Sequence, residues 1–548
     1  MDKEKQSVMQ IPEGGEFREV RSDTDRISQQ AILRISENLK NRNYVLAVSH
    51  ANYLVALGGT EKVLHEEQVE LEKRNISYIQ VYPCDSYDNC VEKKHSDQLV
   101  GVNVDSVPVG NFTIVQLGLI LQLLNLSRTT NAAAIHIHHL MGLSILGIKC
   151  LINTIQAQKL RFFLHDYYTI CPQFNLLKDD KIYCGGPPVE SEECRECIWG
   201  EKRKAQFSMF KAVFKSVKAD FVIPSEIAAT IWSRSFPEHA NHLRVVPHQI
   251  PREIGGNGPE RLERLNDPGY RPKIAYVGYE GVNKGCYTWW NITSEQTVKK
   301  QYELFHLGAA SVDIPGVTTV PVSFLDEGPD AMVKALDKHQ IDIAFLWSIW
   351  PETYSFTLYE ALASGCLVVT NSLSGNIAEQ VKGGSRGIVF NDEAEMLKFL
   401  NDLPRVKEAI RRNLRENSPH ELEFNPQLAV ESADGLNMKG DQSVDKEAKD
   451  FFNGNTARWY SLLRKLEVES IRAEHIEHTQ HTKHIERTEN IENIGLNHDR
   501  ADNIHRIVER LKRMIDRYPL SGRIARKTLF HVRRIVDLLR RNSQKFRH

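Results

Sequence analysis

The sequence lacks the features of a membrane-spanning or strongly charged protein. Its longest apolar runs, such as the one around Ile343–Trp350, fall far short of the roughly 20 residues that a spanning helix needs. The 70 Lys and Arg nearly balance the 71 Asp and Glu, and a formal charge of −1 argues against a surface devoted to nucleic acid. An apolar fraction of 41% makes wholesale disorder unlikely. The 548 residues suffice for three or four domains, or for two large ones with extensions.

The first residues, MDKEKQSVMQIPEGGEF, lack the apolar segment of a secretory signal. We therefore expect a cytoplasmic protein whose nine cysteines stay reduced. In that compartment, clustered thiols indicate a metal site before a disulfide.

Two series of short apolar runs alternate with helical stretches. The first, residues 43–248, includes YVLAVS, AAAIHIHH and DFVIPS, and the second, residues 271–415, includes KIAYVGY, IDIAFLW and CLVVTN. Such alternation predicts two doubly wound α/β domains with parallel sheets. Residues 249–270 carry Pro and Gly without apolar periodicity and predict a linker. Two such domains would face each other across a ligand-binding cleft.

Three further segments lie outside these domains: an N-terminal extension (1–42), a linker with an amphipathic helix at Ala457–Leu466 (416–468), and a tail (469–548). Histidines recur every third residue at 475, 478, 481 and 484, a period that fits neither a helix nor a heptad. We interpret this tract as low-complexity sequence, either a solvated helix or an oligomerising stalk, with metal binding as the alternative.

The end of the tail, Leu520–His548, is strongly basic. It contains nine Lys or Arg and one Asp, a formal charge of +8, and its apolar residues fall on roughly one helical face. A helix of this kind can lie on an anionic membrane surface, which would make the protein peripheral to the inner face of a membrane. The alternative is a basic helix packed on its own protein or on a partner.

The stretch Pro351–Ser372 holds two carboxylates, Glu352 and Glu360, separated by seven residues. We expect a helix to begin near Ser355 and to end at Gly365, before a buried strand. A helix start offers free N–H groups and the positive end of the dipole, which suit a diphosphate. A carboxylate only accepts hydrogen bonds and therefore matches the paired hydroxyls of a sugar.

This stretch resembles the E-x7-E motif of retaining family 4 glycosyltransferases, which have the GT-B fold. The resemblance implies that Glu352 contacts the donor sugar as a catalytic residue and that Glu360 contacts the ribose of the nucleotide. It implies that the backbone of Tyr354, Ser355 and Phe356 binds the diphosphate.

Other segments resemble the same family. IAYVGYEGVNKG is similar to its phosphate-binding turn, which implies donor-binding roles for Gly278 and Lys284, although Tyr279 stands where an arginine is common. LGGTEKVL is similar to its glycine loop and implies the same for Gly58 and Gly59.

Histidines end two of the resembling strands. In IHIHHLMG the resemblance implies a catalytic His138, with His139 in its place if the register slips by one, and a satisfied core histidine as the alternative. LHDYY implies that His165 lines the acceptor side, and VPHQI is similar to the hinge that leaves the first domain.

A cysteine-rich insertion, residues 171–197, follows the H-D-Y sequence. It contains Cys171, Cys184, Cys194 and Cys197, the last two in C-x2-C spacing, which favours a structural zinc site over free thiols or disulfides. A subset of the resembled enzymes carries a similar insertion.

The resemblance implies transfer of a sugar, with retention, from a nucleotide-diphosphate sugar to a glycan or lipid-linked acceptor. The default setting is bacterial surface polysaccharide or glycoprotein glycan synthesis. No D-x-D triplet lies near these motifs, so we expect no catalytic metal. The alternatives are a catalytically silent GT-B scaffold and another GT-B enzyme, such as a sugar-nucleotide epimerase or a phosphorylase.

Overall fold

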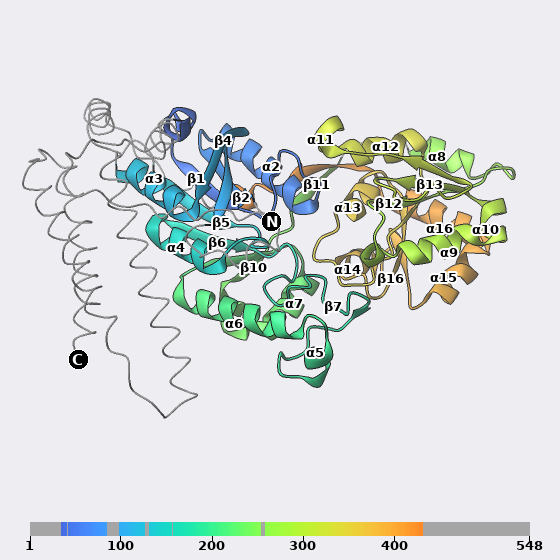
Figure 1. Cartoon of the computed structure of the whole chain (residues 1–548). Helices are drawn as coiled ribbons and strands as arrows, with labels where there is room; N and C mark the ends of the chain where they lie inside the picture. Colours follow the sequence, from blue (N-terminus) through green and yellow to red (C-terminus); the bar gives the residue numbers. More distant parts are fainter. Residues whose placement is uncertain are drawn as a thin grey trace, which may run out of the picture.

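The computed structural model describes residues 34–40, 42–84, 98–126, 131–155, 157–253 and 258–430. Two lobes, each built around a mostly parallel sheet, adjoin one another (Figure 1). The predicted pair of Rossmann-like domains in the GT-B arrangement is thereby confirmed. The Ala457–Leu466 helix, the histidine tract and the basic tail lie outside the described residues.

The first lobe contains an eight-stranded sheet. Its strand order is β10-β9-β6-β5-β1-β2-β3-β4, and all neighbours are parallel except the pairs β2–β3 and β3–β4. The strands are β1 (Tyr44–Val48), β2 (Ser77–Pro83), β3 (Leu99–Val104), β4 (Val107–Thr113), β5 (Ala132–Ile137), β6 (Lys159–Phe163), β9 (Asp220–Ile223) and β10 (Leu243–Val245). The main helices are α2 (Gly59–Lys73), α3 (Ile114–Leu126), α4 (Ile145–Ile155), α6 (Gly200–Ser216) and α7 (Glu226–Ser235).

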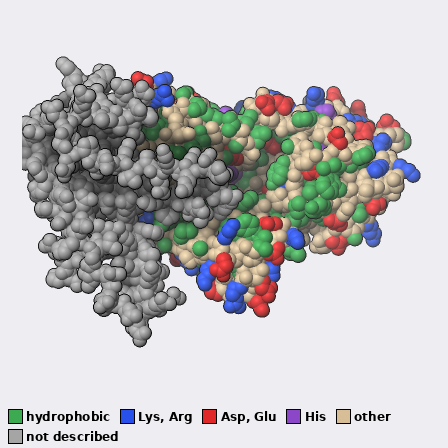
Figure 2. All heavy atoms as spheres, in the orientation of Figure 1, with side chains coloured by type: hydrophobic (Ala, Val, Ile, Leu, Met, Phe, Trp, Pro, Cys, Tyr) green, Lys and Arg blue, Asp and Glu red, His purple; other side chains and the backbone are tan. Residues whose placement is uncertain are grey.

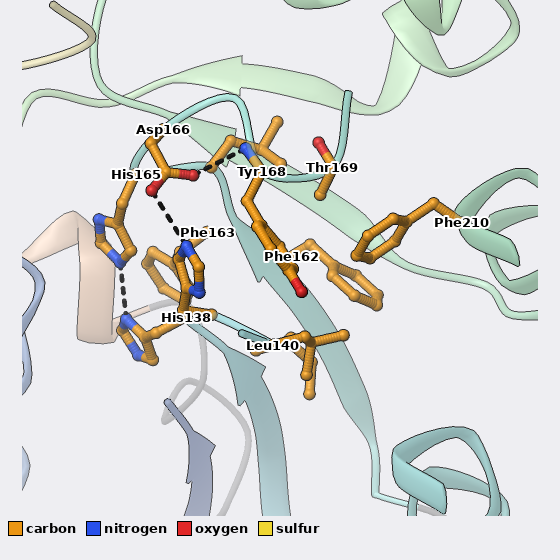
Figure 3. Close-up of a pocket in the computed structure, with 12 residues that line it drawn as sticks. His138, Leu140, Phe162, Phe163, His165, Asp166, Tyr168, Thr169 and Phe210 are labelled. Atoms are coloured by element: carbon orange, nitrogen blue, oxygen red, sulfur yellow. Dashed lines mark hydrogen bonds and ion pairs between the residues drawn. The ribbon is translucent and has the colours of Figure 1, made fainter. Parts of the chain in front are cut away.

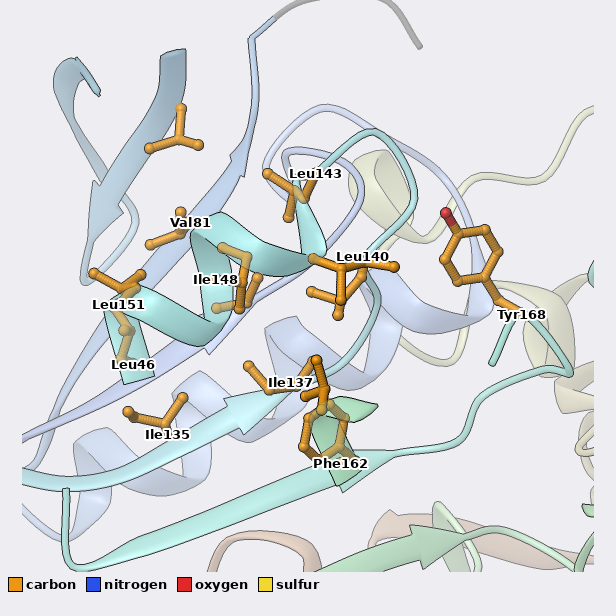
Figure 4. Packing of buried hydrophobic residues seen from close by; sticks show 14 of the residues in the cluster. Leu46, Val81, Ile135, Ile137, Leu140, Leu143, Ile148, Leu151, Phe162 and Tyr168 are labelled. Atoms are coloured by element: carbon orange, nitrogen blue, oxygen red, sulfur yellow. The ribbon is translucent and has the colours of Figure 1, made fainter. Parts of the chain in front are cut away.

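The spacing of apolar residues explains how α4 packs on this sheet. Ile145, Ile148, Leu151 and Ile155 recur every three or four residues, so they share one helical face, and all four are buried. Figure 4 shows Ile148 and Leu151 of α4 near residues of β1, β2, β5 and β6. Each such side chain contributes about 1.5–3 kcal/mol when fully buried, so this layer holds the strand ends in place.

The second lobe contains a six-stranded parallel sheet in the order β14-β13-β12-β15-β16-β17. This is the doubly wound order, whose direction of winding reverses between β12 and β15. The strands are β12 (Lys273–Val277), β13 (Glu303–Leu307), β14 (Val317–Val320), β15 (Ile343–Phe345), β16 (Leu367–Asn371) and β17 (Gly387–Phe390). The helices include α9 (Cys286–Ser294), α10 (Gln296–Gln301), α11 (Phe324–Glu327), α12 (Ala331–His339), α13 (Phe356–Ala363), α14 (Asn376–Val381), α15 (Glu393–Leu400) and α16 (Leu403–Glu416).

The segment expected to be an irregular linker contains two regular elements. β11 (Gln249–Glu253) pairs antiparallel with β18 (His420–Phe424), and α8 (Gly258–Arg264) precedes Leu265, which is buried in the core of the second lobe. After β18 the chain reaches α17 (Gln427–Val430), and Arg161 of β6 donates to the Leu428 carbonyl over 2.8 Å. The chain therefore contacts the first lobe again before residue 431.

The surface agrees with the near-zero net charge. On the face in Figure 2, basic and acidic side chains are interspersed over the second lobe. Within the described ranges, no helix is both long enough and apolar enough to span a bilayer.

Candidate functional site

Two predicted donor residues meet where the winding of the second sheet reverses. Gly278 follows β12, and Lys284 ends a 3-10 helix (Val282–Lys284) in the same loop. Glu352 lies in the loop after β15 and is 2% exposed. The Lys284 ammonium donates to both Glu352 carboxylate oxygens over 2.7 and 2.8 Å, and the Ser348 hydroxyl also donates to Glu352. Open α/β sheets bind ligands at this position.

The charge state of Lys284 follows from this contact. Burial by itself lowers the pKa of the ammonium, but the charge of Glu352 and their hydrogen bond raise it above its ordinary value. Lys284 is therefore a fixed cation at neutral pH.

Helix α13 begins where the sequence predicts. Ser355 caps it by accepting a hydrogen bond from the Leu358 N–H over 3.4 Å, and the Ser355 N–H donates to Asn376 over 3.4 Å. Glu360 lies in the second turn of this helix, and its side chain is 7% exposed.

Glu360 is held by a residue of the other lobe. The Lys62 ammonium, on α2, donates to Glu360 Oε1 over 2.7 Å and to the Pro329 carbonyl over 2.9 Å. The Lys62 side chain is 6% exposed, so this ion pair is buried between the lobes. Sequence reasoning missed Lys62 because its partner lies 298 residues away, although Lys62 stands three residues after Gly59.

The glycine loop lets the two lobes approach. Gly58 caps α2 without a side-chain hydrogen bond, and the buried acid Glu61 lies in the first turn of this helix. A Cβ added to Gly59 would lie 3.3 Å from the Phe356 ring, tighter than most contacts of this kind. The Lys62 ammonium lies 4.9 Å from the centre of the same ring. The starts of α2 and α13 therefore adjoin, an arrangement that suits an anion.

His138 is enclosed at the end of β5. Its Nε2 contacts Glu67 Oε2 over 3.0 Å, and its Nδ1 contacts His165 Nε2 over 3.0 Å, so both ring nitrogens have protein partners. The His138 side chain is 0% exposed. Both ring nitrogens are thus engaged by side chains of the first lobe, and the catalytic role of His138 stays a prediction.

The alternative residue His139 is also engaged. Its Nε2 contacts Asp166 over 3.0 Å, and its Nδ1 accepts from the Met141 N–H over 3.1 Å. A cavity of about 20 Å³ between the ends of β5 and β6 touches His138, His165 and Asp166 (Figure 3). A space of that size holds about one water molecule.

His165, expected on the acceptor side, lies where the lobes meet. Its carbonyl accepts from the Thr353 hydroxyl of the second lobe, and its ring stacks on that of His138 at 5.2 Å between centroids. Tyr167 and Ser225 of the first lobe donate to the carbonyls of Pro351 and Thr353 over 3.1 and 2.7 Å. The residues directly before and after Glu352 are thus both hydrogen-bonded to the first lobe.

Helix α2 also supplies two acids that sequence reasoning missed. Glu67 is fully buried and contacts both His136 and His138. Glu66 lies one residue earlier; its Oε1 accepts from Gln249 over 3.5 Å, and its Oε2 is buried without a hydrogen-bond partner among the described residues. Burial, the main cause, raises the Glu66 pKa to about 7, with Lys62 lowering it and Glu360 raising it.

Replacing Glu66 by glutamine should stabilise the protein more at pH 8 than at pH 5. The pKa of the Glu66 carboxyl is about 7 in the folded protein and 4.5 in model compounds. Between these two pH values, the folded protein therefore binds a proton that the unfolded chain releases. The cost of the buried charge therefore grows as pH rises, to an upper bound of about 3 kcal/mol above pH 7. Urea unfolding at both pH values measures it; an equal effect at both would contradict the burial of this charge.

The cysteine-rich insertion folds as a small irregular unit with β7 (Leu177–Lys178), β8 (Ile182–Tyr183) and α5 (Glu192–Glu196). Cys171 and Cys194 are buried, and Cys184 and Cys197 are partly exposed. Burial, aided by Cys184 and Cys194, raises the Cys171 pKa to about 12. A free thiol there would be protonated and unreactive.

The four sulfurs are not gathered at metal-ligand distances. Across the described ranges, Glu67, His136 and His138 form the one group of three metal-capable residues whose ligand atoms all lie within 4.8 Å of one another. No three thiols meet that limit. The buried Arg203 guanidinium donates to Cys194 Sγ over 3.1 Å and otherwise to the Ile170 and Pro187 carbonyls. No carboxylate among the described residues forms an ion pair with this cation.

No protein-family model and no curated protein matches this sequence. Among solved structures, a sucrose-phosphate synthase from Thermosynechococcus elongatus is similar at 14% identity and a TM-score of 0.42, over 71% of this chain and 96% of that one. Anabaena Alr3699/HepE in complex with UDP-glucose is similar at 11% identity and a TM-score of 0.44, over 71% and 98%. WaaG, a glycosyltransferase involved in lipopolysaccharide biosynthesis, is similar at 14% identity and a TM-score of 0.40, over 75% and 100%.

Proposed function

We propose that this chain is a retaining glycosyltransferase of the family 4 type, which moves a sugar from a nucleotide-diphosphate sugar to a glycan or lipid-linked acceptor. The observation that carries the proposal is the meeting of Lys284 and Glu352 at the reversal point of the second sheet, next to the start of α13. A cation, a carboxylate and free helix N–H groups are the groups that a sugar diphosphate requires.

The proposed mechanism uses these groups in fixed roles. As the bond between the sugar and the diphosphate breaks, negative charge grows on the leaving oxygen, and Lys284 with the helix N–H groups stabilises it. An acceptor hydroxyl forms the new bond on the same face of the sugar and gives its proton to the leaving phosphate. Glu352 positions the sugar hydroxyls and forms no bond to carbon. Closure of the lobes excludes water and limits hydrolysis.

A thermal-shift screen against nucleoside diphosphates and nucleotide sugars tests the proposal. A true donor should raise the melting temperature. At 100 times its Kd, the bound donor adds about 2.7 kcal/mol to the free energy of unfolding. Release of the nucleoside diphosphate in the presence of a crude glycan or lipid acceptor then identifies transfer. Binding of no member of the panel would support the silent scaffold instead.

We also propose that the four cysteines of the insertion hold one structural zinc ion. The support is the pairing of Arg203 with Cys194, together with the C-x2-C spacing. Metal analysis of the purified chain should find about one zinc per molecule, since a Cys₄ site binds a single ion. Cys194→Ser should lower that content, whereas Cys150→Ser on α4 should not. A zinc-free wild-type protein with four titratable thiols would refute this assignment.

A cytoplasmic location and a role in bacterial surface glycan synthesis belong to the same proposal. Contact of the basic tail with an anionic membrane is a further part of it, and its residues lie outside the described ranges.

A further inference from the structure

A chain of four hydrogen-bonded side chains runs from the core of the first lobe to the junction of the lobes. It begins at Glu67 on α2 and passes to His138 after β5, over 3.0 Å. From His138 it passes to His165 after β6 over 3.0 Å, and from there to His248 before β11 over 3.3 Å. We call Glu67, His138, His165 and His248 together the histidine ladder.

Glu67 sets the charge at the inner end of the ladder. His136 Nδ1 contacts its Oε1 over 2.7 Å, while His138 and the Tyr78 hydroxyl contact its Oε2 over 3.0 and 2.6 Å. Three donors around one carboxyl group match an ionised carboxylate, which has only acceptors. Burial by itself raises the pKa of Glu67. His136 and His138 lower it by more than burial raises it, so the pKa lies below the ordinary value of a glutamate.

An ionised Glu67 determines the tautomer of each ring in turn. His138 Nε2 faces the carboxylate and is assigned as the donor, and His138 Nδ1 is assigned as the acceptor in the contact with His165. His165 must then donate to it from Nε2, which leaves its own Nδ1 as an acceptor for His248 Nε2–H. Each neutral imidazole has one donor and one acceptor nitrogen, so the direction passes along the ladder without a break.

The last acceptor in the ladder has no partner. His248 Nδ1 is buried and lacks a hydrogen-bond partner within the described structure. Burial, followed by His138, lowers the pKa of this ring to about 3, and burial also lowers that of His165, with His248 and His138 adding to the effect. Both rings are therefore neutral at physiological pH, as the assigned tautomers require.

His248 lies beside residues of the predicted diphosphate segment. Its ring stacks on Phe356 at 5.7 Å and 13°, and contacts the Tyr354 ring at 4.7 Å. The neighbouring Gln249 N–H donates to the Tyr354 hydroxyl over 3.2 Å. Because Tyr354 and Phe356 belong to the second lobe and His248 to the first, separation of the lobes uncovers this ring.

We propose that His248 Nδ1 is a hydrogen-bond acceptor for a hydroxyl group of the sugar nucleotide, and that Glu67 is the positioning residue that fixes its orientation through His138 and His165. The proposal rests on the proposed function for the identity of the ligand. It also moves the ligand-facing histidine from His138, whose nitrogens are both engaged, to the far end of the ladder.

The tautomers are tested directly, without any ligand. Nitrogen-15 NMR of histidine-labelled protein at pH 7.5 should show His248, His165 and His138 protonated on Nε2 alone. Glu67→Gln, which replaces two acceptor oxygens by one acceptor and one donor, should abolish this uniform pattern. A wild-type His248 that carries its proton on Nδ1, or two protons, would overturn the proposal.

Binding is tested with His248→Phe, which keeps a ring against Phe356 and removes the acceptor. Its affinity for the nucleotide sugar found in the thermal-shift screen should fall about tenfold, the value of one neutral hydrogen bond. The matched control is His242→Gln, because His242 is exposed and lies outside the ladder. An unchanged affinity in His248→Phe would refute the acceptor role.

The nucleoside diphosphate without its sugar identifies the hydroxyl. An unaltered affinity for it in His248→Phe assigns the hydroxyl to the sugar, and an equal loss assigns it to the ribose; both support the acceptor role. If the wild-type protein binds no nucleotide sugar, the proposed function fails, and the NMR result still decides whether the ladder has the direction inferred here.

Discussion

Glu352→Gln should abolish sugar transfer while the protein stays folded. Glutamine keeps the size of the side chain but loses one acceptor oxygen and the charge that faces Lys284. Loss of a single group that acts at the transition state costs about 10² to 10³ in turnover, and we expect the upper end because Glu352 also orients the cation. Release of nucleoside diphosphate from the donor found in the screen measures the effect.

The comparison with Glu360 separates the two carboxylates. Glu360→Ala should mainly weaken nucleotide binding, because its proposed partner is the ribose and not the transferred sugar. Glu408→Gln, an exposed change on α16, serves as the control and should leave both quantities unaltered. Circular dichroism must show that each variant is folded. Wild-type activity in both Glu352→Gln and Glu360→Ala would contradict the site assignment.

Lys62→Met should destabilise the protein by about 3–5 kcal/mol, the usual cost of removing one partner of a buried ion pair. The change leaves the Glu360 carboxylate, which is 7% exposed, without its cation. The double variant Lys62→Met/Glu360→Gln removes both charges and should regain much of this loss. Urea unfolding of the two single variants and the double variant gives the coupling energy.

A surface pair provides the reference for this experiment. The side chains of Lys334, on α12, and Asp330, the residue at the cap of α12, are 64% and 55% exposed. Lys334 Nζ lies 2.8 Å from Asp330 Oδ1. Lys334→Met should change stability by no more than about 0.5 kcal/mol. Additive effects of the Lys62 and Glu360 changes would mean that water enters between the lobes and that the ion pair does not join them.

This ion pair also bears on donor binding. Lys62 forms an ion pair with Glu360, the carboxylate that is proposed to bind the ribose, and both side chains are almost completely buried. A nucleotide can reach Glu360 only if Lys62 gives up this contact. The ammonium would then be free to face the diphosphate at the start of α2, where the glycine loop already provides N–H groups.

Local patterns in the sequence predicted the two α/β domains and several of their strands and helices. Buried β-branched runs such as KIAYVGY predicted strands, and the stretch around Glu360 predicted a helix from near Ser355, the residue that caps α13 in the structure. These signals are local, since they depend on neighbours within a few residues. The same holds for the spacing of Glu352 and Glu360, which follows from one loop and one helix.

The pairing of charged and polar side chains is visible only in the folded structure. Lys62 reaches Glu360 across 298 residues, and Glu67 joins His136, His138 and Tyr78 from separate elements. No local pattern marks such partners, because burial and the packing of distant elements create them. The engagement of both His138 nitrogens, and the lack of a partner for the buried His248 Nδ1 within the described residues, likewise depend on contacts that exist only once the strand ends and the hinge are brought together.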